Sequence, residues 1–179
     1  PYFLWHLFFQ DVLERGGFDV IVQNPPYLRH EKLAPDSKRQ LKGVYSCYSG
    51  QSDIYVCFYQ QALRLLRRGG TLSIISSNKW LRGDYGKRLK RLMSEEFSVR
   101  TLLDFGELQL FKGVSTFPLI LIGENVRDER HFPRIVNVRS LDPPYPNINQ
   151  LIQGNGWDAD ETTITGHSWH IAGPGVGRF

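Results

Sequence analysis

The chain has 179 residues, of which 41% are apolar and 13% aromatic, enough to bury a core, so the composition excludes a disordered tail. It has no run of eighteen apolar residues and no leader-like N-terminus, so we expect a cytoplasmic protein without a membrane span. The two cysteines, Cys47 and Cys57, lack CxxC spacing, which excludes a disulfide scaffold and a structural zinc site; we expect plain thiols and no metal.

The net charge of +4 is spread unevenly along the chain. Residues 29–100 carry fifteen Lys and Arg against six Asp and Glu, a net of +9, so the remainder nets −5. Such a basic stretch is either the solvated face of a folded domain or the footprint of phosphate binding. Charge alone does not separate the two.

The first predicted elements are a strand, a loop and a helix. Residues 18–23 are a nearly continuous apolar run that ends at two prolines, which predicts a strand buried on both faces. Residues 28–51 are polar and basic, which predicts a long exposed loop. Ser52 is the expected cap of the helix that follows, and Gly69-Gly70 is its expected stop.

The next elements complete an alternating pattern. Residues 71–76 indicate a second strand, and residues 85–96 an amphipathic helix with Leu89 inward and Lys90 outward. Further strands are predicted at residues 99–105, 116–122 and 133–138. Strands alternating with helices are typical of an α/β fold with a parallel sheet and right-handed crossovers.

A change of composition near Leu141 predicts a domain boundary. Prolines, glycines and a polar run replace the periodic pattern, and we expect no helix or strand beyond this point. We therefore expect one domain at residues 1–140, and at residues 141–179 a linker and the start of another module.

The tetrapeptide Asn24-Pro25-Pro26-Tyr27 directly follows the first predicted strand. Open α/β sheets bind ligands at the carboxyl ends of their strands, so a catalytic loop belongs here. The Asn24 side-chain oxygen and the Pro25 carbonyl are two acceptors that consecutive prolines hold in place. Two acceptors aimed at an aromatic amine draw its lone pair out of conjugation and make it nucleophilic. Tyr27 adds a face for a base flipped out of a duplex.

A looser copy of the tetrapeptide, Asp142-Pro143-Pro144-Tyr145, occurs near the predicted boundary. Either copy could be a plain polyproline turn, so the surroundings must separate them. The first copy lies between a predicted strand and a βαβ unit, whereas no predicted helix or strand follows the second. We interpret the first copy as a catalytic loop and the second as linker.

Five blocks of residues occur in an order and spacing typical of one family. They are Phe18-Asp19-Val20-Ile21-Val22-Gln23-Asn24-Pro25-Pro26-Tyr27, Ser52-Asp53-Ile54-Tyr55 with Phe58, Leu65-Leu66-Arg67-Arg68-Gly69-Gly70-Thr71-Leu72, Ser77-Asn78-Lys79-Trp80-Leu81, and Phe111-Lys112-Gly113-Val114-Ser115-Thr116. With these blocks, roughly residues 5–122 resemble the adenine-specific DNA amino-methyltransferases of bacterial restriction-modification systems, of the type IIG-like class that fuses methylation to target recognition.

The resemblance implies a partial, Rossmann-like class I methyltransferase fold. It also implies base-flipping methylation of adenine N6 in double-stranded DNA, with S-adenosylmethionine as the donor. Residues 1–140 would then be the catalytic half of a methyltransferase domain, and residues 141–179 a linker and the start of a target-recognition domain.

Site residues carry over position by position. Asn24, Pro25 and Pro26 would form the catalytic loop, with Tyr27 and Phe111 stacking on the two faces of the base. Phe111 could instead be a core residue, with Phe117 as the alternative second aromatic. Phe58, with Asn24, would line the S-adenosylmethionine pocket, although Phe58 also falls on the predicted core stripe of its helix. The candidate DNA contacts are Arg29, His30, Lys32 and Lys79.

The resemblance also implies features that this chain does not show. A glycine-rich turn and an acidic residue for the donor should lie upstream of the catalytic loop, but only seventeen residues precede Phe18, and they contain neither. We therefore expect the chain alone to be inactive. We also expect an exposed sheet edge through which two copies can form a homodimer.

Two other functions stay open at this point. Protein glutamine N-methyltransferases use the same tetrapeptide on an amide nitrogen, but they are compact, and the basic insertion at residues 29–42 fits a DNA enzyme better. A non-catalytic DNA-binding module could keep the fold without the reaction. Loss of donor binding with retained DNA affinity would identify such a module.

Overall fold

The computed structural model describes residues 3–111, 117–128, 131–142, 147–160, 163–166 and 168–171. Within these ranges the helices are α1 (Trp5–Phe8), α2 (Gln10–Glu14), α3 (Pro35–Val44), α4 (Tyr55–Leu65), α5 (Lys79–Arg82), α6 (Lys87–Glu96) and α7 (Ile148–Asn155), with short 3-10 helices η1 (His30–Lys32) and η2 (Asp84–Gly86). The strands are β1 (Phe18–Gln23), β2 (Leu66–Ser77), β3 (Ser98–Asp104), β4 (Pro118–Glu124), β5 (Arg134–Asn137), β6 (Trp157–Asp158), β7 (Ile164–Thr165) and β8 (Ser168–Trp169).

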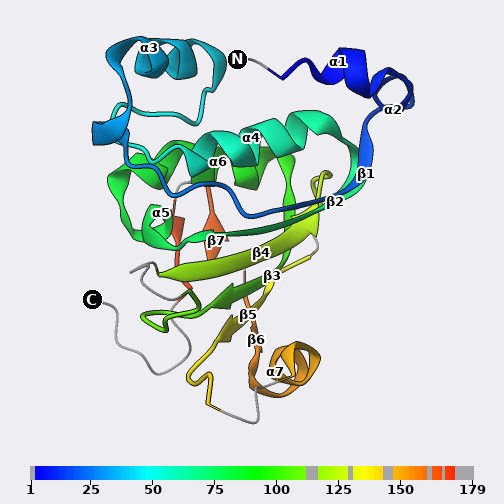
Figure 1. The fold of residues 1–179 in the computed structure, drawn as a ribbon. Helices are drawn as coiled ribbons and strands as arrows, with labels where there is room; N and C mark the ends of the chain where they lie inside the picture. Colours follow the sequence, from blue (N-terminus) through cyan, green and yellow to red (C-terminus); the bar gives the residue numbers. More distant parts are fainter. Residues whose placement is uncertain are drawn as a thin grey trace.

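Six of the described strands form one twisted sheet in the order β1-β2-β4-β3-β5-β6 (Figure 1). β1 is parallel to β2 and β3 to β5, whereas β4 is antiparallel to both of its neighbours. A parallel return from β3 would need a crossover, usually a helix, and the described part of the β3–β4 connection contains none, so the chain turns back. The ends of β1, β2 and β3 therefore share one end of the sheet with the start of β4. We call it the carboxyl end, and the other the amino end.

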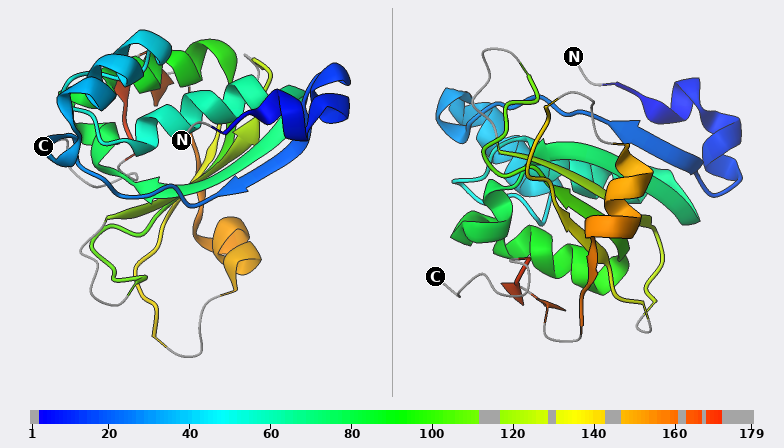
Figure 2. Two further views of the ribbon diagram at one scale, coloured as in Figure 1. Left: turned by 45° about the horizontal axis from the view of Figure 1, so that its top comes forward. Right: turned by 90° about the horizontal axis from the view of Figure 1, so that it is seen from below.

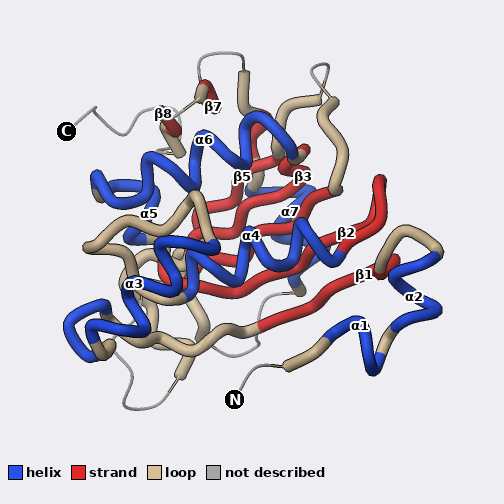
Figure 3. The backbone as a smooth tube through the Cα atoms, turned by 90° about the horizontal axis from the view of Figure 1, so that it is seen from above, coloured by secondary structure: helices blue, strands red, loops and turns tan. Residues whose placement is uncertain are grey.

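One face of the sheet is covered by helices. α4 packs over β2 and α6 over β3, and α3 lies on the same side beyond α4 (Figures 1 and 3). Apolar side chains from both layers meet there and form the main core. Its fully buried members include Tyr59, Leu72, Trp80, Leu89 and Leu121.

The opposite face is covered only in part among the described residues. α7 packs against β5 on this face (Figure 2), and Leu151 of α7 meets Leu103 and Val136 in a second, smaller core. The other end of the same face, at β1, has no such cover. The expectation that β1 is buried on both faces is therefore wrong.

β1 lies at one edge of the sheet, as expected from the residues that precede it. Ile21 packs against the main core, but Val20 and Val22 are 57% and 77% exposed. Successive side chains of a strand point to opposite faces, so an edge strand covered on one side leaves every second residue in solvent. The apolar run in β1 therefore gives the strand an apolar outer face, and no described helix or strand packs on that face.

The boundary between α4 and β2 differs from the prediction. α4 ends at Leu65 and β2 begins at Leu66, so Gly69, with φ +73°, lies inside a strand instead of stopping a helix. The cause is tertiary pairing, because Asn125 exchanges backbone hydrogen bonds with Gly69 and Gly70 at 2.9 and 2.8 Å. Ser52 does not cap α4, since its hydroxyl bonds to Ser49 at 2.8 Å.

The segment after Leu141 is more regular than expected. The Asn147 side chain caps α7 by accepting from Asn149 N at 2.9 Å, and β6 adds to β5 as a sixth strand. Trp169 of β8 packs edge-on against Trp80, 5.3 Å between ring centroids. The expectation that no helix or strand follows Leu141 is wrong, because these residues pack against β5 and against Trp80. Residues 143–146 of the second tetrapeptide lie outside the described residues.

No helix in the described part of the chain is long and apolar enough to cross a membrane.

Candidate active site

The loop that follows β1 leaves the carboxyl end of the sheet at Asn24. Residues 24–29 form no helix or strand; Asn24 and Pro26 are exposed, and Pro25 is buried. The Leu28 carbonyl accepts a 3.1 Å hydrogen bond from Ile54 N, which ties the loop to the start of α4. Asn24 caps neither η1 nor α3 nor α4, so its side chain lies in solvent without a capping role.

Tyr27 is half-buried at the other end of the tetrapeptide. Its ring packs against the main core, with its centroid 6.4 Å from that of Tyr55 at an interplanar angle of 60°. Its hydroxyl is buried and has no hydrogen-bond partner among the described residues. Burial raises the pKa of Tyr27, so the hydroxyl stays protonated at neutral pH. Tyr27 therefore has a ring fixed on one side by the core.

Asp53 interacts electrostatically with charged groups that follow β1 and β2. It is half-buried, and desolvation raises its pKa, while the positive charges of Arg29 and Lys79 lower it to a smaller extent. A lysine after β2 and an arginine after β1 thus act on the same carboxyl group. Behind it, the hydroxyls of Tyr55 and Tyr85 are hydrogen-bonded at 2.9 Å. Charged residues after both strands therefore lie within electrostatic range of one carboxyl group.

The predicted DNA contacts also follow β1 and β2. Arg29 and Lys32 are exposed. The His30 side chain is 25% exposed, with Nδ1 3.5 Å from a carboxylate oxygen of Glu31. The Lys79 ammonium lies 5.2 Å from the centre of the Phe117 ring, a cation–π distance. Basic and aromatic groups therefore both occur at the carboxyl end.

Phe58 lies on the side of α4 next to β1. It is half-buried, whereas Cys57 and Tyr59 on either side of it are buried. Its backbone carbonyl accepts a 3.2 Å hydrogen bond from Gln23 Nε2, the last residue of β1. Phe58 is thus outside the buried core, contrary to the core-stripe alternative, and close to the strand that precedes Asn24.

Both candidate second aromatics are half-buried at the carboxyl end. Phe111 follows Leu110, which packs against the second core, so the chain is anchored just before it. Phe117 precedes β4, and its carbonyl accepts a 2.7 Å hydrogen bond from Asn78 N. Neither ring is fully buried, and both stay candidates for stacking.

Two polar residues of this end were not singled out from the sequence. Asn78 and Asp104, the residues after β2 and at the end of β3, are 3% and 6% exposed and share a 2.8 Å hydrogen bond. Asn78 belongs to one of the blocks that carry the family resemblance, which was an available signal. Asp104 gave none, because nothing in sequence distinguishes it from a residue that ends a strand.

Neither cysteine offers a nucleophile. Cys47 and Cys57 are free and buried, as expected of plain thiols, and burial raises the pKa of each to about 12. Both are therefore protonated at neutral pH. No group of three His, Cys, Asp or Glu side chains that could hold a metal occurs among the described residues.

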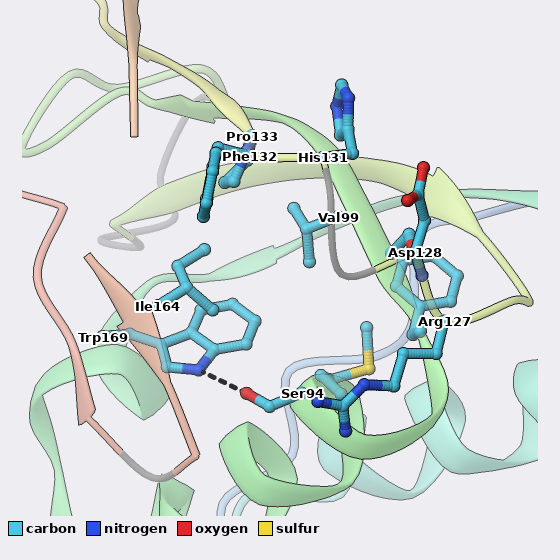
Figure 4. A pocket seen from close by; sticks show the side chains of 12 residues that line it. Ser94, Val99, Arg127, Asp128, His131, Phe132, Pro133, Ile164 and Trp169 are labelled. Carbon is cyan, nitrogen blue, oxygen red and sulfur yellow. Dashed lines mark hydrogen bonds between the residues drawn. The ribbon is translucent and has the colours of Figure 1, made fainter. Parts of the chain in front are cut away.

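A cavity of about 360 Å³ lies at the amino end of the sheet, away from the tetrapeptide. Figure 4 shows aromatic and charged side chains around it, Trp169 on one side and Arg127 and Asp128 on the other. Trp169 Nε1 donates to Ser94 Oγ at 3.1 Å across its floor. No residue predicted from the sequence as functional lines this cavity.

Sequence comparisons identify relatives of the chain. Residues 2–111 match the family described as Eco57I restriction-modification methylase. The type II methyltransferase M.BstVI of Geobacillus stearothermophilus is 32% identical over 122 residues, which are 68% of this chain and 21% of that protein. The type II restriction enzyme and methyltransferase RM.Eco57I of Escherichia coli is 34% identical over 107 residues, 58% of this chain and 11% of that protein.

Structural comparison shows the same fold. A class I S-adenosylmethionine-dependent methyltransferase structure from Listeria monocytogenes superimposes with a TM-score of 0.55 at 22% identity, over 72% of this chain and 39% of that one. The expected class, a partial Rossmann-like class I methyltransferase fold, is confirmed. The chain spans about a fifth of the length of the first curated relative.

Proposed function

The chain belongs to the Eco57I restriction-modification methylase family, and from this premise we propose that it is the catalytic part of a longer, base-flipping DNA methyltransferase that acts on adenine N6. The observation that carries the proposal is the position of Asn24-Pro25-Pro26-Tyr27 at the carboxyl end of β1. Ligand sites of open α/β sheets lie there. The adjoining surface holds the basic and aromatic groups that a nucleic-acid substrate requires.

The proposed chemistry uses few residues of this chain. The Asn24 side-chain oxygen and the Pro25 carbonyl accept hydrogen bonds from the adenine amino group and localise its lone pair on nitrogen. Pro25 and Pro26 restrict the backbone, so neither acceptor has to be ordered when the base arrives. Tyr27 stacks on one face of the base, and Phe111 or Phe117 on the other.

The methyl donor in this proposal is S-adenosylmethionine, which supplies an electrophilic methyl group when bound. Phe58 and Asn24 fit one side of such a site, because a half-buried ring beside β1 can pack on a purine and an exposed amide can hydrogen-bond. These residues alone form only part of a donor site. We propose that the longer protein supplies the rest.

Arg29, His30, Lys32 and Lys79 are the proposed contacts to the DNA backbone. Their placement beside the catalytic loop supports this role, since phosphate contacts position a duplex while the flipped base enters the site. α3, which lies on the same side of the molecule (Figure 1), contains the basic residues Lys38, Arg39 and Lys42.

We further propose the division of the chain into a catalytic half at residues 1–140 and, at residues 141–179, a linker with the start of a target-recognition domain. The packing of α7 and β8 on the first domain is compatible with a linker that fixes the direction of the following module.

The free edge of β1 is the proposed site of self-association of the 179-residue chain. Its unpaired backbone groups and the exposed Val20 and Val22 are what a second strand would cover. We expect wild-type dimers in sedimentation velocity and monomers after Val22→Lys, with Val44→Lys on α3 as the matched exposed control. A monomeric wild type at every concentration would contradict this part of the proposal.

Mass spectrometry of DNA digests tests the function. Unmodified bacteriophage DNA is incubated with the whole protein and labelled donor, and N6-methyladenine is the expected product. Label in N4-methylcytosine would contradict adenine specificity, and label in the glutamine of a peptide would favour a protein methyltransferase. DNA binding without any label would indicate a non-catalytic module.

A further inference from the structure

Asn78 and Asp104 join two strands that are not neighbours in the sheet. Asn78 follows β2 and Asp104 ends β3, with β4 lying between the two strands. Asn78 Nδ2 donates to Asp104 Oδ1 at 2.8 Å, with the two residues 3% and 6% exposed. The pair therefore bridges the position where β4 begins.

The two bridged residues also contact the segments where the chain leaves β3 and enters β4. Gly106 N donates to the same Asp104 oxygen at 3.0 Å, in a turn where Gly106 has φ +54°. The backbone N of Asn78 donates to the Phe117 carbonyl at 2.7 Å. The Asp104 side chain thus holds the turn that leads toward Phe111, while the Asn78 side chain anchors the residue whose backbone holds Phe117.

The pair is an unfavourable choice for stability alone. Burying a carboxylate and an amide requires that both be hydrogen-bonded, and well-packed apolar residues often serve a core as well or better. Because burial of Asn78 and Asp104 gains little stability, the pair points to a role in the site beside it.

The residue next to the bridge contacts the groups at the carboxyl end of the sheet. Lys79 directly follows Asn78, and its ammonium lies 5.2 Å from the Phe117 ring centre. The same lysine acts on Asp53 together with Arg29, which follows the catalytic loop. In the sheet, Gln23 lies opposite Ile74 and Ser77 opposite Pro118, so only β2 separates the start of the catalytic loop from Phe117.

We propose that Asn78 and Asp104 are positioning residues that place Phe117 against the flipped base and Lys79 at the DNA backbone, an inference that rests on the proposed function. Neither side chain touches the substrate. Their hydrogen bond sets the distance between the aromatic side of the base site and the Asn24 acceptors. An error of about 1 Å in such a distance can lower a rate by about 10²-fold.

Exchange of the two residues tests the proposal. Asn78→Asp places two carboxylates in contact, whereas the double variant Asn78→Asp with Asp104→Asn restores a donor and an acceptor with their positions swapped. For the single variant of the whole protein we expect kcat on DNA to fall by about 10-fold to 10²-fold. KM for DNA should change by less than about 3-fold, because phosphate contacts dominate affinity. The double variant should recover most of kcat.

A spectroscopic readout on the 179-residue chain separates positioning from stability. With 4-fluorophenylalanine at position 117, the fluorine resonance should shift or broaden in Asn78→Asp and return in the double variant. Ser76→Ala is the matched control, because it removes another buried hydrogen bond, the 2.8 Å contact with Tyr59, at the same end. It should lower the melting temperature while leaving the fluorine resonance and kcat unchanged.

The outcomes are distinguishable from failure of the proposed function. If the wild-type whole protein does not methylate DNA, the proposed function fails, and the fluorine signal still tests whether the pair places Phe117. If Asn24→Ala abolishes methylation but Asn78→Asp keeps full kcat, or the fluorine signal does not move, the positioning role is overturned. Should Asn78→Asp not fold, Asp104→Asn and the double variant carry the same measurements.

Discussion

The two ends of the sheet differ in shape and in the groups that they hold. The amino end holds the 360 Å³ cavity with Trp169, Arg127 and Asp128, whereas the carboxyl end holds the exposed Asn24 and the buried Asn78–Asp104 bridge. The cavity lies at the amino end, whereas the strand topology favours the carboxyl end, because loops that follow parallel strands converge there. In this chain the cavity and the strand direction therefore point to opposite ends of the sheet.

The charged groups have different neighbours at the two ends. At the amino end, Arg100 is paired with both Glu124 at 2.7 Å and Asp128 at 3.3 Å. At the carboxyl end, the Lys79 ammonium lies 5.2 Å from the centre of the Phe117 ring, and Arg29, Lys79 and Glu31 all act on Asp53.

The largest expected effect is complete loss of activity in the 179-residue chain alone. Its carboxyl end holds the proposed acceptors for the base, but Phe58 and Asn24 would supply only part of the proposed donor site. In a labelled-methyl assay we expect no incorporation into DNA, with the whole protein as the active control. A rate of about 1 per second, or even a hundredth of that, would contradict this expectation.

Replacing the exposed amide comes next. Asn24→Ala in the whole protein should lower turnover by about 10²-fold or more, the scale for loss of one preorganised polar contact in a transition state. DNA affinity, measured by fluorescence anisotropy, should change little. Full turnover in this variant would remove Asn24 from the mechanism whatever the fold.

A pair of charge variants compares the two ends of one strand. Lys79→Gln follows β2 at the carboxyl end, and Arg68→Gln lies near its start. Loss of one phosphate contact should reduce the slope of log affinity against log salt by about 1. We expect this for Lys79→Gln and no change for Arg68→Gln. Equal slopes for the two variants would contradict an electrostatic difference between the ends.

The smallest expected effect is at the cavity. Phe132 lines it and is 36% exposed, so Phe132→Ala should be tolerated by the fold. We expect turnover and DNA affinity of the whole protein within about 2-fold of wild type, since surface changes far from a site alter little. A loss of turnover comparable to that of Asn24→Ala would assign a function to the amino end and contradict the difference between the two ends.

Most elements that depend on local pattern were predicted well, but the exposed loop predicted at residues 28–51 is wrong, because Pro35–Val44 form the helix α3. The alternating order of helices and strands and the positions of β1, β3 and α6 follow from apolar periodicity, which the chain carries in every window. Prediction failed where a distant partner decided the outcome. Residues 66–70 join β2 instead of α4 because Asn125 pairs with Gly69 and Gly70.

The site was predicted in the same uneven way. The tetrapeptide and its place after β1 were readable because prolines act on their own backbone and mark the end of a strand. The Asn78–Asp104 bridge was not, since its partners are distant in the chain and meet only when β4 folds between β2 and β3. Lys90, expected in solvent, donates to the Leu81 carbonyl at 3.0 Å, and desolvation lowers its pKa.

By itself the sequence determined the α/β class, the catalytic-loop candidate and the basic stretch, because these depend on residue type, periodicity and near neighbours. Only the tertiary structure decided that β4 runs antiparallel, that β1 keeps Val20 and Val22 in solvent and that Trp169 returns to Trp80. These features depend on which surfaces meet. A side chain is buried only when another surface packs against it, and the sequence pattern of one segment does not show which other segment will do so.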